Sequence, residues 1–110
     1  MTDAIQVITT TGTKEDADKI ARALLEARLA ACIQVVGPIT SHYWWEDEIE
    51  EAEEWLCLIK TTGNRFERFE KAIQAAHPYD VPEILALPVV AGSADYLAWL
   101  RGELRAASDS

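Results

Sequence analysis

Apolar and polar residues follow two different periods in the first quarter of the chain. Residues 5–10 are rich in β-branched side chains, and a Thr-Gly-Thr stretch separates them from residues 14–28, where apolar side chains recur at helical spacing. Thr13 and Asp16 form an approximate capping box, in which the hydroxyl accepts a free amide hydrogen of the first helical turn. The pattern therefore predicts a strand followed by a helix.

The middle of the chain contains two long segments of β-type composition, at residues 32–45 and 49–61. A Gly-Pro pair at 37–38 interrupts the first segment and predicts a bulge or bend, because proline cannot donate a hydrogen bond to a neighbouring strand. Residues 46–48 must then reverse the chain, and aspartate tolerates the positive φ of a tight turn. We interpret this region as a long hairpin.

The rest of the sequence predicts a helix, a strand and a second helix. Asn64 and Glu67 have capping-box spacing and open a helix that Pro78 ends. Residues 83–90 have strand composition, but prolines flank or enter them, so at least one side of this strand is not fully paired within the chain. Ser93 begins a short last helix, in which leucine and aromatic side chains recur.

The predicted order of elements is βαββαβ followed by a C-terminal helix. This order is typical of ferredoxin-like α+β domains, in which the helices cover one face of an antiparallel sheet. No repeat, linker or low-complexity segment divides the chain, so residues 1–110 are expected to form a single domain.

The predicted hairpin is longer than the domain that carries it. Each arm has about 13 residues and spans roughly 43 Å, whereas a compact domain of this length is about 34 Å across. The tip carries Tyr43, Trp44 and Trp45, which form a large apolar area to leave in water. We therefore expect other copies of the chain to cover the hairpin. The alternative is a tip that folds back over its own sheet, with the acidic residues beside it guarding the edge.

Composition restricts the class of protein. The 110 residues are 49% hydrophobic and 26% charged, which excludes a disordered chain. There is no uninterrupted apolar segment of membrane-spanning length, and the N-terminus lacks the blocks of a signal peptide, so the expected location is the cytoplasm, without membrane contact. Two cysteines are too few for a disulfide framework and are expected to stay reduced.

The net charge of −9 comes mainly from one stretch, since residues 46–54 carry seven carboxylates and no basic side chain. The ten lysines and arginines are scattered rather than gathered into a stripe, which argues against nucleic acid as a partner. Carboxylates along a strand alternate between its faces, whereas a calcium or magnesium site needs them to converge. Specific metal binding by this acidic stretch is therefore not the favoured interpretation.

The segment HPYDVPEI at 77–84 is the strongest candidate site in the chain. His77 is either a metal ligand or a cap for helix carbonyls, and Cys32 is either a metal ligand or a packed thiol. Lys60 ends an apolar strand, where its ammonium group could pair with Glu83 or, together with it, bind a ligand.

Aromatic residues could line a pocket around these polar groups, or they could fill the core of an oligomer. They are Trp45, Tyr79, Tyr96 and Trp99. No nucleophile, base and orienting group can be assembled from the sequence motifs, and no phosphate-binding loop is present. We therefore do not expect an enzyme.

Five strings of residues at consistent intervals resemble the CutA divalent-ion tolerance family, over about residues 5–104. They are LAAC at 29–32, YWWE at 43–46, LIKT at 58–61, HPYDVPE at 77–83 and DYLAWL at 95–100. The resemblance implies a trimer of ferredoxin-like subunits whose hairpins pair across neighbours and whose pockets lie between subunits. It also implies a similarity to PII signalling trimers, although a shared fold is a poor guide to the ligand.

Family members are associated with tolerance of copper and other divalent ions, and some bind copper through a cysteine on the first strand and two histidines before Pro-Tyr. In this chain those positions are Thr9, Ala76 and His77, so only one of these donors is present. The favoured hypothesis is a homotrimer that binds copper or another divalent cation through His77, with Cys32 or Glu83, and needs no cofactor to fold.

Two other hypotheses remain. The first is a non-catalytic signalling or scaffold trimer that holds a small anionic molecule between its subunits, in a pocket that includes Lys60 and the aromatic residues above. The second is an interaction module without a ligand. A metal site would require at least two more donors near His77.

Overall fold

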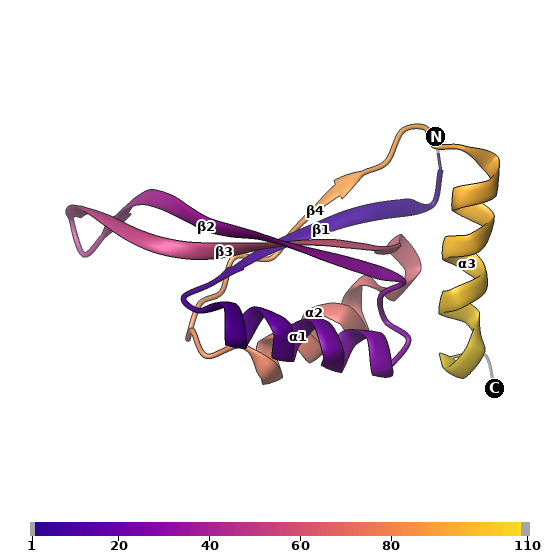
Figure 1. Cartoon of the computed structure of the whole chain (residues 1–110), viewed down its shortest axis with the longest axis horizontal. Helices are drawn as coiled ribbons and strands as arrows, with labels where there is room; N and C mark the ends of the chain where they lie inside the picture. The colour runs from indigo at the N-terminus through magenta and orange to yellow at the C-terminus, as the bar shows by residue number, and fades with distance from the viewer. Residues whose placement is uncertain (1, 109–110) are drawn as a thin grey trace.

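The computed structural model describes residues 2–108, which form an α+β domain (Figure 1). Its elements are β1 (Ala4–Thr11), α1 (Lys14–Glu26), β2 (Cys32–Trp45), β3 (Glu48–Thr62), the short 3₁₀ helix η1 (Gly63–Arg65), α2 (Phe66–Ala76), β4 (Leu85–Pro88) and α3 (Ala94–Ser108). The four antiparallel strands lie in the order β2-β3-β1-β4. The predicted βαββαβ order and its additional helix are therefore confirmed.

Helices α1 and α2 pack side by side on one face of the sheet (Figure 1). At the start of α1, the amide of Asp16 donates to Oγ1 of Thr13 at 3.1 Å, so the predicted cap is present. The helix ends at Glu26, two residues earlier than predicted, and Arg28 has a φ of 57° in the turn that follows.

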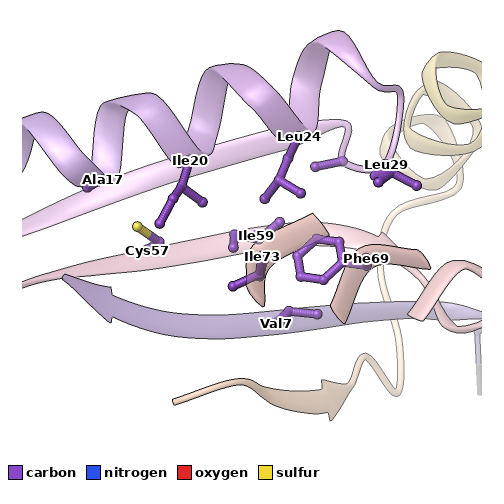
Figure 2. Close-up of a cluster of buried hydrophobic side chains, with 10 residues drawn as sticks. Val7, Ala17, Ile20, Leu24, Leu29, Cys57, Ile59, Phe69 and Ile73 are labelled. Atoms are coloured by element: carbon purple, nitrogen blue, oxygen red, sulfur yellow. The ribbon is translucent and has the colours of Figure 1, made fainter. Parts of the chain in front are cut away.

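The core lies between these two helices and the strands beneath them, as Figure 2 shows. Its side chains come from α1, α2 and the two central strands, and all are less than 2% exposed: Ile20, Leu24, Phe69, Ile73, Val7, Cys57 and Ile59. The period-2 spacing of Cys57 and Ile59 points both side chains to the helix-covered face. The spacing of residues within each helix and strand therefore directs these side chains into the core.

The hairpin of β2 and β3 extends well beyond the helices (Figure 1), and the described chain measures 45 × 27 × 22 Å. Its two turn residues, Glu46 and Asp47, have φ values of 49° and 64°, as a two-residue turn between twisted strands requires. The register shifts between Val36 and Ile39, which confirms the bulge at the Gly-Pro pair. The tip does not fold back over the sheet.

Two local predictions need correction. Asn64 does not cap α2, because the η1 turn intervenes and Oδ1 of Asn64 instead accepts a hydrogen bond from the Thr62 hydroxyl at 2.6 Å. The last strand is Leu85–Pro88 rather than 83–90, although the amide of Val89 still donates to the carbonyl of Ala4 at 3.1 Å. The prolines that flank and enter this strand limit its pairing.

The sheet face opposite α1 and α2, called the open face below, has no helix over its central part, while α3 lies across the end of the sheet away from the hairpin tip (Figure 1). Residues paired directly across antiparallel strands share a face. The strand register therefore gathers these apolar residues on the open face: Ile8, Val36, Leu56, Leu58, Leu85 and Leu87. None of the described helices has the length and apolar character needed to cross a bilayer.

Candidate functional site

The residues predicted to form one site lie in two separate groups. Trp45, Tyr79 and Glu83 line a cavity of about 720 Å³ between the hairpin and the segment after α2, called the hairpin cleft below. The ring of His77 lies beside Tyr79, with 4.7 Å between the ring centroids. This group occupies the part of the sheet nearest the hairpin tip.

The second group lies beside α3. Lys60 and Tyr96 line a smaller, mostly apolar cavity of about 290 Å³, called the α3 cavity below. Cys32 is paired directly with Lys60 across β2 and β3, and the ring of Trp99 lies 5.5 Å from that of Tyr96. Burial raises the pKa of Tyr96, and its charge interaction and hydrogen bond with the neighbouring Cys32 add to this shift.

His77 is buried at the end of α2 and uses both ring nitrogens within the chain. The amide of Tyr79 donates to Nδ1 at 3.1 Å, which leaves Nε2 as the protonated nitrogen, and Nε2 donates to the carbonyl of Thr10 at 2.7 Å. The amide of His77 also donates to the carbonyl of Ile73, as a helix cap does. The imidazole therefore connects β1 to the segment that follows α2.

Lys60 and Glu83 do not meet within one subunit. Nζ of Lys60 donates to Oε1 of Gln34, its neighbour on β2, at 2.5 Å. Glu83 lies in the hairpin cleft, whereas Lys60 lines the α3 cavity. The strand register explains the separation, because Lys60 pairs with Gln6 while β4 begins only opposite Ile8. The predicted Lys60–Glu83 ion pair is therefore wrong for a single chain.

A metal ion does not fit the predicted donors of one subunit. Among the described residues, no three histidine, cysteine, aspartate or glutamate side chains lie close enough together to hold a metal. Cys32 and Glu83 belong to different groups, and His77 has no free ring nitrogen. A lone donor of any of these types holds a metal only weakly.

The hairpin cleft contains a buried carboxylate that the sequence analysis missed. Glu54 is 8% exposed, and Oε2 of its side chain accepts a hydrogen bond from the Tyr79 hydroxyl at 2.8 Å. Burial raises the pKa of Tyr79 to about 12, and the hydrogen bond to Glu54 adds to the shift, so the phenol remains a donor at ordinary pH. The sequence did carry a signal: Glu54 is in phase with Leu56 and Leu58 on one face of β3.

The cleft is acidic and aromatic. Four carboxylates line it, from Glu50, Glu54, Asp80 and Glu83, together with the rings of Tyr43, Trp45 and Tyr79, and no lysine or arginine is among its lining residues. His42 also lines the cleft, and its Nδ1 lies 3.5 Å from Glu51 on the neighbouring strand. The arrangement is suited to a positively charged group rather than to an anion.

The family model described as CutA1 divalent ion tolerance protein matches residues 5–103. The divalent-cation tolerance protein CutA of Thermus thermophilus is 47% identical over 95 residues, covering 86% of this chain and 92% of the relative. Human protein CutA is 44% identical over 94 residues, but this chain spans only 52% of its length.

The fold is also similar to solved structures. The structure of the divalent cation tolerance protein (Cut A1) from Thermus thermophilus superposes with a TM-score of 0.89 at 45% sequence identity. The match covers 91% of this chain and 97% of that one. The similarity therefore extends over the whole domain, including the long hairpin.

Proposed function

Because the chain belongs to the CutA1 divalent ion tolerance protein family, we propose that it takes part in tolerance of divalent cations, copper foremost. It acts as a cytoplasmic homotrimer and not as an enzyme, in keeping with a family that is named for tolerance rather than for a reaction. Ions bind between subunits, because the donors in the described part of one subunit do not converge.

The observation that carries the proposal is the apolar open face. Val36, Leu85 and Leu87 on this face are 45–55% exposed, and Trp44 and Ile49 at the hairpin tip are about 70% exposed. Soluble monomers rarely leave such contiguous apolar area in water. A second and third copy packed against the open face would bury it and would also support the projecting hairpin.

Cyclic symmetry gives such a trimer a way to assemble a site. A three-fold ring uses heterologous contacts, so one surface of a subunit meets a different surface of the next. The group around Cys32 and the group around Glu83 lie on different parts of the sheet, and only a contact between subunits can bring them together. A thiolate and a carboxylate from neighbouring subunits would then both be available to an ion.

The test is a calorimetric titration of copper under reducing conditions, with Cys32→Ser and Glu83→Gln as variants and Glu51→Gln as the exposed control. We expect saturable binding in the wild type and the control, and binding at least about tenfold weaker in the two variants. Growth of cells lacking the gene, with and without each variant, at rising copper concentration tests tolerance itself.

A mixed assembly distinguishes a site between subunits from a site within one. Coexpressed Cys32→Ser and Glu83→Gln chains have no intact site within any subunit, whereas random mixing leaves about a quarter of the contacts between subunits intact. Recovery of about a quarter of the wild-type binding supports the interface site. No recovery in assemblies shown to be mixed would overturn it.

A second candidate function is a signalling or scaffold trimer that binds a small anion. The α3 cavity favours it, because Lys60 lines this mostly apolar space together with Tyr96. A screen of nucleotides and small carboxylic acids by thermal shift tests this candidate. Stabilisation that Lys60→Gln abolishes supports it, and an equal shift in that variant rules out Lys60 as the anion's partner.

A further inference from the structure

No described residue provides a cationic partner for the buried carboxylate of Glu54. Among the described residues, the hydroxyl of Tyr79 is the only hydrogen-bond donor to this side chain, and Glu54 takes part in no ion pair. Burial of a carboxylate is unfavourable unless hydrogen-bond donors or a charge of opposite sign compensate it. A neutral phenol compensates only part of this cost, so the site is electrostatically incomplete.

The surroundings of Glu54 add to this negative potential instead of relieving it. Glu50, Asp80 and Glu83 line the same cleft, and the one residue there that can become cationic, His42, lies beside Glu51. A cavity with low-dielectric walls and charge of one sign concentrates ions of the opposite sign. The hairpin cleft therefore favours a cation.

The shape of the cleft determines which kind of cation it takes. Its carboxylates surround about 720 Å³ instead of converging, and the described residues contain no group of three donors that could hold a metal ion. This volume is in the range of sites for small organic molecules. The rings of Trp45, Tyr43 and Tyr79 provide apolar walls that also attract cations through their faces.

We propose that the hairpin cleft binds an organic cation, whose ammonium or guanidinium group pairs with Glu54 while its carbon skeleton lies against Trp45 and Tyr79. This site shares Glu83 with the ion site between subunits, but it differs from that site in its central residue, Glu54, and in its ligand chemistry. It has no residue in common with the α3 cavity. The cation comes either from a free small molecule or from a lysine or arginine side chain of a second copy of this chain.

The first arm of the test measures free ligands. Choline and agmatine are titrated into the protein by calorimetry, together with 3,3-dimethylbutanol, which has the shape of choline without its charge. We expect both cations to bind and the neutral alcohol to bind at least about tenfold more weakly. Glu54→Gln removes the charge, keeps the shape of the side chain and should weaken cation binding at least about tenfold.

Two further variants complete the first arm of the test, one within the cleft and one outside it. Glu83→Gln changes an exposed carboxylate of the cleft and should weaken binding several-fold. Glu51→Gln is the matched control for Glu54→Gln. It removes an exposed charge from β3, the strand that carries Glu54, at a position outside the cleft. It should leave the affinity for both cations unchanged.

The second arm detects a cation supplied by another copy of the chain. In that case the free cations do not bind, but Glu54→Gln raises the dissociation constant of the oligomer about tenfold by sedimentation, and Glu51→Gln does not. The proposal is overturned if Glu54→Gln changes neither cation binding nor assembly, or if the neutral alcohol binds as well as choline. Neither result would bear on the Cys32→Ser arm of the copper titration, because Cys32 lies outside the hairpin cleft.

Discussion

At the scale of single residues, His77 has a structural role that its sequence pattern did not specify. The sequence placed it at the end of a helix and left ligation or capping open. In the structure its ring accepts from Tyr79 and donates to Thr10, so it joins two segments that lie 67 positions apart in the sequence. A residue with both nitrogens in such bonds serves mainly to position the segment that forms one wall of the hairpin cleft.

Replacing His77 with alanine should therefore destabilise the fold. The change leaves a buried carbonyl on Thr10 and an amide on Tyr79 without partners, at a cost of about 2–3 kcal/mol. His42→Ala is the control, because this exposed histidine has only a surface pairing with Glu51, worth about 0.5 kcal/mol or less. Urea unfolding measures both values. Equal losses in the two variants would contradict a structural role for His77.

Because of Cys57, the free energy of unfolding should depend on pH in the alkaline range. Burial raises the pKa of its thiol to about 11, and the charge of Asp18 adds to this shift. A raised pKa stabilises the folded state below the unfolded pKa near 9, and this contribution is lost as the pH rises through 11.

We expect the free energy of unfolding to fall by up to about 1.4 kcal/mol per pH unit between pH 9 and 11 through this group. Cys57→Ala should remove this component although it lowers stability at pH 7, and Cys32→Ala should retain it. Urea unfolding at several pH values compares the slopes. An unchanged slope in Cys57→Ala would assign the alkaline loss to other groups.

At the scale of elements, the turn and the bulge of the hairpin differ in the side chains that they accept. The turn at Glu46 and Asp47 accepts positive φ without glycine, whereas the bulge at Gly37 has no room for a side chain. A Cβ atom added to Gly37 would overlap the ring of Trp55 on the paired strand. The bulge therefore fixes the register of the outer half of the hairpin.

Gly37→Ala should destabilise the protein by about 1–3 kcal/mol, because the Trp55 ring must move out of its packed position. Gly63→Ala is a matched control, since an added Cβ there meets only the carbonyl oxygen of Asp3, at 3.9 Å. Thermal unfolding and tryptophan fluorescence report on both. A Gly37→Ala variant as stable as Gly63→Ala would show that the bulge is not rigid.

At the scale of the whole molecule, one sheet face is covered by its own helices and the other is not. Leu25 on α1 and Leu87 on the open face have similar exposure, 41% and 45%. They differ in their surroundings, because Leu87 belongs to a contiguous apolar face, whereas Leu25 lies on α1 beside the ion pair of Arg22 and Glu26. Introducing a charge at each of these two positions and measuring assembly therefore tests which face forms the oligomer.

Leu87→Glu should raise the dissociation constant of the proposed homotrimer at least about tenfold while the subunit stays folded, because it places a charge in the apolar contact of that assembly. Leu25→Glu makes the same substitution at similar exposure and should leave assembly intact. Sedimentation velocity gives the oligomeric state, and circular dichroism checks the fold. Full assembly of Leu87→Glu would exclude the open face as the interface.

The sequence by itself determined the features that depend on neighbouring residues. The element order, the cap at Thr13, the bulge after Val36 and the projection of the hairpin all follow from local periodicity, turn residues and segment length. Five short strings also indicated the family, which the comparisons then showed.

Only the tertiary structure decided which of these residues meet. Strand order and register separated Lys60 from Glu83, gave Lys60 the partner Gln34, and placed Tyr79 over Glu54. Such contacts join residues far apart in the sequence, and a period of two or 3.6 specifies only the face on which a side chain lies. Each partner is determined by how the strands align, and this alignment emerges only when the whole sheet forms.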